Sequence, residues 1–336
     1  MSNNSFGGKD RYYSSTPPDD SYRKSHLSKT EEEIKAALLV VDPDIQRRIE
    51  RTFRQWNTII REQLRNEMGL RLTVSGEYQS VPVRIATGLA RPLHDAFRNM
   101  EPLYWQLLFN RGMLEASKPG LSFLFSNCHA ITVQTVQEPC LHIQKSLQYI
   151  ETILASLDKE KLLQQALAIE HDLLGAYFYN NSQIELYWMA IGLVAGSLGI
   201  KPEALTLVVA IHELAHAYSH LGKDIDGTQW DKSNFENADL HIVEGIAQHY
   251  TKVICHTMDT RLPGTQKAFE TLLCYQSTPY TIFKEWNLPP ESGGEVVRLA
   301  MIACRSQGIT EYFSFQETMK NYENIKQNPS RQAKPA

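Results

Sequence analysis

The sequence predicts a mostly helical α+β protein with a small sheet beside one buried helix. Apolar residues recur at helical spacing over several long segments, whereas β-prone pieces are short and few. Residues 204–211 form an apolar run that leads directly into His212-Glu213-Leu214-Ala215-His216, which places both histidines on the buried helix. A chain of 336 residues that is 42% hydrophobic can bury one large core or two modest ones, and its length favours two lobes.

The first strong helical pattern starts near Asp42, which can cap a helix whose first residue is Pro43, and Gly69 is placed to end it. Its apolar residues recur at helical spacing: Ile45, Ile49, Phe53, Trp56, Ile59, Ile60, Leu64 and Met68. The opposite face carries a narrow stripe of arginines: Arg47, Arg51, Arg54, Arg61 and Arg65. This arginine stripe could hold phosphates or an acidic partner, or it could be a solvated face that neighbouring glutamates balance.

The rest of the amino-terminal region is less regular. Residues 70–135 contain two β-prone pieces, Val81–Ile85 and Leu121–Phe125, around an expected helix from Pro92 to about Met113. Residues 141–174 return to helical spacing. We therefore expect a mostly helical region, and we assign no motif to residues 70–135.

Two short strands, or one strand and the start of a helix, are expected where the sequence changes character near Gly175. Gly175–Tyr179 and Ile184–Tyr187 flank a polar turn, and either could be an edge strand or an internal strand of a small sheet. The uncharged run 186–200 is shorter than the roughly 20 residues that cross a bilayer, which favours a buried helix, so no membrane insertion is expected. A membrane segment is the alternative, because some HExxH proteases are embedded in membranes. The motif helix should run from about Glu203 to Leu221, where Gly222 ends it.

Composition narrows the class of protein. The net charge of -4, from 38 acidic and 34 basic residues, gives no global bias toward nucleic acid or an anionic membrane surface, and no nucleic-acid partner is expected. The five cysteines lack CxxC spacing, which favours a reducing compartment and hence a cytoplasmic location. Residues 1–30 lack the apolar core of a secretory signal and are expected to be a disordered tail, as are residues 326–336.

The string His212-Glu-Leu-Ala-His216 carries the strongest chemical signal. Residues four apart lie on one face of a helix, so both imidazoles can bind one tetrahedral metal ion, with Glu213 beside the metal. A third ligand must come from further along the chain. A metzincin would use the position that Gly222 occupies, which excludes that pattern, whereas Asp224 or Asp226 could serve as in the aspzincins.

The remaining source of a third ligand is Glu244, within His241-Ile-Val-Glu-Gly-Ile-Ala-Gln-His-Tyr250. With this segment, residues 175–255 resemble the gluzincin zinc metallopeptidases, the thermolysin-like group in which a second helix supplies a glutamate ligand. The resemblance implies a zincin-like catalytic domain over 171–325, whereas the mostly helical region expected over 31–170 lies outside the resemblance. It implies Zn²⁺ on His212, His216 and Glu244, with Glu213 as the general base.

The resemblance also implies an activity. Zinc lowers the pKa of a bound water to around 7, and Glu213 would take its proton during attack on a peptide carbonyl. One more donor must stabilise the transition state; the main candidates are His241 and Tyr280, with Tyr187 and His249 as further ones. A peptide or protein substrate would lie antiparallel to the edge strand.

Several points stay open. Gln248 stands where the thermolysin pattern has an aspartate that orients a ligand histidine, and its amide oxygen could accept that N–H less effectively. His220 could end the motif helix or join the surroundings of the metal, and Trp230, Phe235 and Trp286 could line a pocket or belong to the core.

Two other functions are compatible with the motif. The fold could be a regulatory or binding module with little peptidase activity, although a purely structural metal site needs no general base. The chain could also cut one specific partner protein, since His212–His220 is similar to compact HExxH proteins of bacteria and phages. The third-ligand segment typical of that group is absent. The sequence indicates no substrate identity, mode of cleavage or oligomeric state.

Overall fold

The computed structural model describes residues 28–72, 74–75, 78–79, 81–90, 148, 173–224, 227–288 and 293–327. The expected helix from Pro92 to Met113, the β-prone piece Leu121–Phe125 and most of the helical pattern over 141–174 lie outside these residues. Within them the chain is mostly helical with one small three-stranded sheet, which confirms the predicted class.

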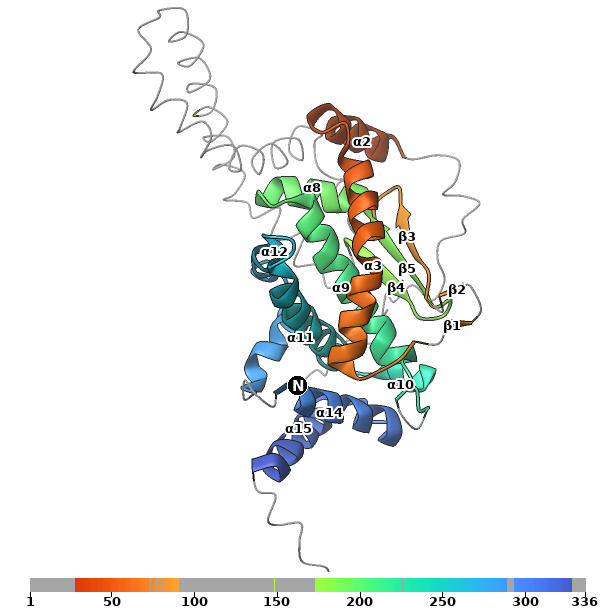
Figure 1. The fold of residues 1–336 in the computed structure, drawn as a ribbon, viewed down its shortest axis with the longest axis vertical. Helices are drawn as coiled ribbons and strands as arrows, with labels where there is room; N and C mark the ends of the chain where they lie inside the picture. The colour runs from red at the N-terminus through yellow and green to blue at the C-terminus, as the bar shows by residue number, and fades with distance from the viewer. Residues whose placement is uncertain are drawn as a thin grey trace, which may run out of the picture.

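The helix with the HExxH string, α9 (Pro202–Leu221), lies at the centre of the fold (Figure 1). Helices α3 (Ile45–Met68) and α11 (Leu240–Asp259) both pack along it, and the sheet covers a further side. Nearly the whole length of α9 is buried, because its apolar residues continue around the helix rather than along one stripe.

Helix α3 confirms the predicted amphipathic helix. Its buried face consists of Ile45, Ile49, Thr52, Phe53, Trp56, Ile60, Leu64 and Met68. The helix ends where predicted, at Gly69, whose φ of 66° is in the left-handed region that favours glycine. It begins later than expected, at Ile45, and Asp42 does not cap it but forms an ion pair with Arg48.

Most of the arginine stripe on α3 interacts with nearby groups. Arg47, Arg54 and Arg65 form ion pairs with Asp44, Glu50 and Glu62 of the same segment. Arg61 instead contacts the segment that leads into the sheet, because its guanidinium donates to the carbonyl of Val81, two residues before Val83, at 2.7 Å. These contacts favour the interpretation of the stripe as a balanced solvated face.

A helix that the sequence analysis did not identify precedes α3. Helix α2 (Lys29–Val41) begins inside the expected disordered tail and buries Ile34 and Leu38. Ser28 and Glu31 form a capping box at its start, and Glu31 also accepts from the backbone N–H of Leu89 at 2.9 Å. The Ser-x-x-Glu spacing was the signal for this helix.

The sheet has the strand order β3-β5-β4, with β3 (Val83–Ala86) parallel and β4 (Gly175–Phe178) antiparallel to the central β5 (Gln183–Tyr187). The predicted strands at Gly175, Ile184 and Val81 are therefore present with slightly shifted ends. Of the two candidates for an edge strand, the first is at an edge of this sheet and the second is internal. A separate pair joins β1 (Val74–Ser75) to β2 (Tyr78–Gln79).

The apolar run after β5 forms the buried helix α8 (Trp188–Leu198). No helix in the described part of the chain combines the length and the apolar character needed to cross a membrane. After α9 come α10 (Lys232–Asn237), α11, α12 (Thr265–Leu273), α13 (Thr278–Thr281), the 3₁₀ helix η1 (Ile282–Trp286), α14 (Gly293–Gln307) and α15 (Tyr312–Gln327). Trp230, Phe235 and Trp286 belong to the hydrophobic core, to which α2, α3 and all of these elements except α13 contribute.

Two arginines of α14 bind the ends of the central helices. Arg298 donates from Nε to the carbonyl of Met68 at 3.0 Å and from Nη2 to Asp224 at 3.0 Å. Arg305 is buried and donates to the carbonyls of Gly222 and Thr228, just beyond α9. A guanidinium at a helix carboxyl end satisfies carbonyls that have no partner within the helix.

We predict that Arg305→Leu lowers the free energy of unfolding by about 2–4 kcal/mol, because it leaves buried carbonyls without a charged donor. Urea denaturation of the variant and the wild type measures this difference. Arg51→Leu, an exposed change on α3, is the control and should stay within about 0.5 kcal/mol of the wild type. Equal effects of the two substitutions would contradict the role of Arg305.

Candidate metal centre

Helix α9 brings the two histidines of the motif together. It begins at Pro202, a favoured first helical residue, and continues through the motif to Leu221, before Gly222. His212 and His216 lie one turn apart, with ring centroids 4.6 Å apart and Nε2 atoms 3.1 Å apart. Both side chains are buried.

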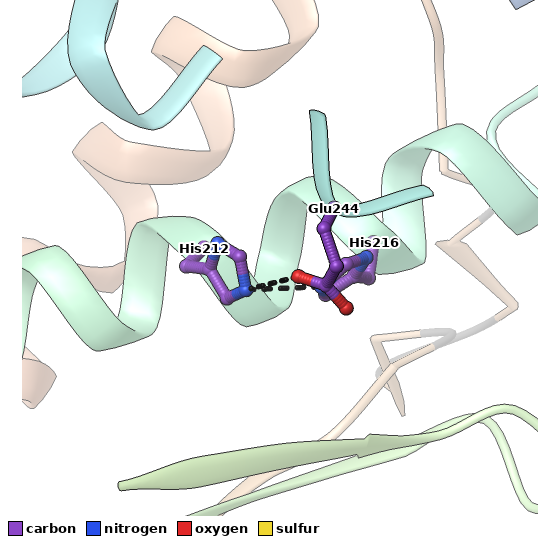
Figure 2. A group of neighbouring side chains, drawn as sticks. All are labelled: His212, His216 and Glu244. Atoms are coloured by element: carbon purple, nitrogen blue, oxygen red, sulfur yellow. Dashed lines mark hydrogen bonds and ion pairs between the residues drawn. The ribbon is translucent and has the colours of Figure 1, made fainter. Parts of the chain in front are cut away.

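Glu244 reaches the same point from α11 (Figure 2). Asp239 caps this helix by accepting from the N–H of His241. The Oε2 atom of Glu244 lies 3.2 Å from Nε2 of His212 and 3.4 Å from Nε2 of His216. Among the described residues, these three form a group whose ligand atoms all lie within 4.8 Å of one another. Asp224 is not part of it and pairs with Arg298, while Asp226 lies outside the described residues.

The separations within this triad fit one tetrahedral ion. Ligand atoms about 2.0–2.1 Å from a zinc ion, at tetrahedral angles, are about 3.3 Å apart. The three measured separations are 3.1, 3.2 and 3.4 Å. All three atoms can therefore bind one small cation while leaving a fourth position open.

The electrostatics of the triad favour the protonation state that a cation needs. Burial alone would raise the pKa of Glu244, but the neighbouring His216 and His212 outweigh it and lower that pKa. Burial and the proximity of His216 lower the pKa of His212, against the opposing influence of Glu244. The carboxylate is thus anionic and the imidazole of His212 neutral at physiological pH.

Glu213 is buried next to the triad and contacts the sheet. A methyl group added to Gly175 of β4 would lie 2.8 Å from Cγ1 of Val209 and 3.0 Å from Cγ of Glu213. The strand therefore approaches the helix at this point as closely as a residue without a side chain allows.

The backbone of β4 has groups that point away from β5. The backbone N–H of Ile184 donates to the carbonyl of Pro82, just before β3. Because the backbone groups of successive residues in a strand point to opposite sides, those of Glu185 and Tyr187 point toward β4. Glu185 is paired with Ala176, and Tyr187 donates to Leu174. The N–H and C=O groups of Gly175 and Tyr177 consequently face the outer edge, which has no partner strand among the described residues.

Tyr280 and His241, the two main candidates for the donor that stabilises the transition state, lie in different surroundings. Tyr280 of α13 is buried, with its ring centroid 5.9 Å from that of His212. His241 interacts with Asp239 through Nδ1 at 2.8 Å, and its ring lies 5.3 Å from that of Tyr312. Of the two, Tyr280 is the one that contacts a residue of the triad. His249 lies against Tyr250 and Trp286, and Tyr187 precedes α8.

Gln248 differs from what the sequence suggested, and Gly245 packs against η1. The amide of Gln248 donates to Gln276 at 3.2 Å, and no described group donates to its oxygen, so it does not accept the N–H of a ligand histidine. A methyl group on Gly245 would lie 2.6 Å from Trp286 and 2.9 Å from Ile282. This glycine therefore allows η1, rather than the motif helix, to approach α11.

His220, at the end of α9, pairs with a residue that the sequence analysis missed. Its Nδ1 lies 2.9 Å from the hydroxyl of Tyr177 on β4, and its ring stacks on Phe235 with centroids 4.4 Å apart. Burial, with Arg305 and Lys232, lowers the pKa of His220 to about 4, against the influence of Asp231. His220 therefore stays neutral at physiological pH, and it does not belong to the group of ligand residues. No sequence spacing links Tyr177 to it, because the contact depends on the tertiary packing of β4.

No known protein-family model, curated protein or solved structure matches this chain.

We predict that His220 contributes to acid destabilisation of the metal-free protein. Its pKa is about 4 when folded, against 6.5 for an unperturbed histidine. The unfolded chain binds this proton first, so the free energy of unfolding falls as pH drops from 6.5 toward 4. His220→Gln should reduce that slope by up to about 1.4 kcal/mol per pH unit, measured by denaturation in a series of buffers. An unchanged slope would contradict the prediction.

Proposed function

We propose that this chain is a zinc-dependent peptidase with a gluzincin-like catalytic domain. The observation that carries the proposal is the convergence of His212, His216 and Glu244 on one point, beside the carboxylate-bearing residue that follows His212. The other support is the HExxH string itself. A metal site with a purely structural role would not need that adjacent carboxylate.

Zinc is the metal that best suits the donors. Two imidazole nitrogens and one carboxylate oxygen are a usual ligand set for catalytic zinc, and the separations fit tetrahedral geometry. Zinc bound there would supply Lewis acidity, which acidifies water and polarises a carbonyl. The ligands also fix the position of this chemistry, because His212 and His216 are on a buried helix in the core.

Glu213 is assigned the role of general base. Its backbone position next to His212 puts its side chain beside the site, and Gly175 confines it from the side of the sheet. Its carboxylate would take a proton from the attacking water and pass it to the leaving amine.

A peptide is the substrate that suits the outer edge of β4. The outward groups of Gly175 and Tyr177 offer two donors and two acceptors in the spacing of a strand, so an extended chain can add antiparallel to them. Gly175 contacts Glu213, so a peptide on this edge would have its backbone near the general base.

A cytoplasmic location also remains a proposal, which rests on the cysteine spacing.

Tyr280 is our choice for the donor that stabilises the transition state. It is buried and its ring lies against that of His212, on the side of the triad that α13 forms. A phenol held there could donate to the oxygen on which negative charge develops. His241 is the alternative, although its Nδ1 already interacts with Asp239.

Metal analysis of purified variants tests the ligand assignment. We expect Glu213→Gln to keep zinc near one per chain and to lower kcat at least about 100-fold, because it changes the base and retains the ligands. Glu244→Ala should weaken zinc binding by at least about 100-fold, more than the loss of an outer partner. Asp226→Ala is the control. If it loses zinc while Glu244→Ala binds as tightly as the wild type, the third ligand is the aspartate.

Tyr280→Phe tests the proposed donor. We expect a kcat about 10²–10³-fold below the wild type with zinc content and KM little changed, since a donor that acts only in the transition state affects kcat. His241→Asn is the matched substitution for the alternative donor. A large kcat loss in His241→Asn, with a normal kcat in Tyr280→Phe, would exchange the two roles.

A further inference from the structure

We propose that Tyr177 and His220 are a positioning pair that holds the outer edge of β4 in register with the metal triad. The inference rests on the proposed function, because it assigns the residues that align an extended peptide on that edge. It predicts that the pair acts on substrates long enough to use the strand. Neither residue belongs to the group of ligand atoms, so the pair would act through the position of β4.

The contact joins the strand directly to the metal-binding helix. The hydroxyl of Tyr177 lies 2.9 Å from Nδ1 of His220, both side chains are buried, and their rings are 5.9 Å apart in an edge-to-face arrangement. His220 is one turn beyond His216 on the same helix. A shift of β4 along or away from α9 would break this hydrogen bond.

Tyr177 is suited to the role because its two halves face different directions. Its side chain points to α9, while its N–H and C=O face the outer edge of the sheet. Gly175, two residues earlier, contacts Glu213 of the same helix and also has its backbone groups at the edge. The strand is therefore fixed to α9 at both residues that offer groups to a peptide.

His220 is itself held in place. Phe235 of α10 stacks on its ring, with planes only 15° apart. Its carbonyl accepts from the N–H of Trp230 at 3.1 Å, and Arg305 binds the carbonyl of Gly222 immediately beyond α9. The partner of Tyr177 is thus a fixed point of the core, as a positioning role requires.

The consequence concerns how substrate length affects the rate. A peptide that pairs with both Gly175 and Tyr177 gains binding free energy from an edge already positioned beside Glu213. A fragment that spans only the scissile bond gains little of this binding free energy. We define the length advantage as kcat/KM for a hexapeptide divided by kcat/KM for its truncation to the residues flanking the scissile bond. Loss of the pair should reduce this ratio.

The test uses Tyr177→Phe in the zinc-loaded full chain, with the best-cleaved hexapeptide of a mixed library and its truncation. We expect the length advantage to fall about tenfold, mainly through a higher KM for the hexapeptide, with zinc content unchanged. Tyr179→Phe is the matched control, because Tyr179 also lies edge-on to His220, with centroids 6.4 Å apart, in the same aromatic cluster. It should keep the length advantage of the wild type.

A second readout does not depend on activity. We expect amide hydrogen exchange at Ala176, which pairs with β5, to be at least about fivefold faster in Tyr177→Phe and unchanged in Tyr179→Phe. If the wild type cleaves no peptide, the proposed function fails and this measurement alone decides the pair. Unchanged exchange in both variants, or an unchanged length advantage in Tyr177→Phe, would overturn the inference.

Discussion

The packing of α11 against α9 is the constraint on which the rest of the structure depends, because it brings one carboxylate to two imidazoles inside the core. Ala215, Ala217 and Ala247 are fully buried on the two helices. Burial of an anionic carboxylate costs several kcal/mol unless a cation or strong hydrogen bonds offset it. A divalent ion shared by His212, His216 and Glu244 would provide that offset, so the metal and the packing of the two helices would stabilise each other.

The surrounding elements fix the position of this helix pair. Glycines permit the close approaches: Gly175 brings β4 onto α9, and Gly245 brings η1 onto α11. Trp286 of η1 in turn donates to the hydroxyl of Tyr312 at 3.0 Å, which joins α15 to the same cluster. Helix α14 binds the carboxyl ends of α3 and α9 through its two arginines. The site is therefore supported on several sides by contacts between elements distant in sequence.

Local patterns identified much of this arrangement. Helix α3, its end at Gly69, the limits of α9 and the strands of the sheet follow from spacing and turn chemistry. The nearness of Glu244 to the histidines was implied by a resemblance rather than by periodicity. What the sequence could not indicate depends on tertiary contacts: Tyr177 against His220, Gly245 against Trp286 and the true partner of Gln248. Helix α2 had a local signal, the capping box that begins at Ser28. The polar composition of residues 1–30 instead led to the expectation of a disordered tail.

X-ray absorption spectroscopy of the zinc-loaded chain tests the central claim most directly, because it counts the ligand types around the metal. The account predicts two imidazole groups and otherwise only nitrogen or oxygen donors, at about 2.0–2.1 Å. A spectrum that requires a sulfur ligand at about 2.3 Å, or that shows a single imidazole, would contradict the proposed pairing of α9 and α11 around one ion.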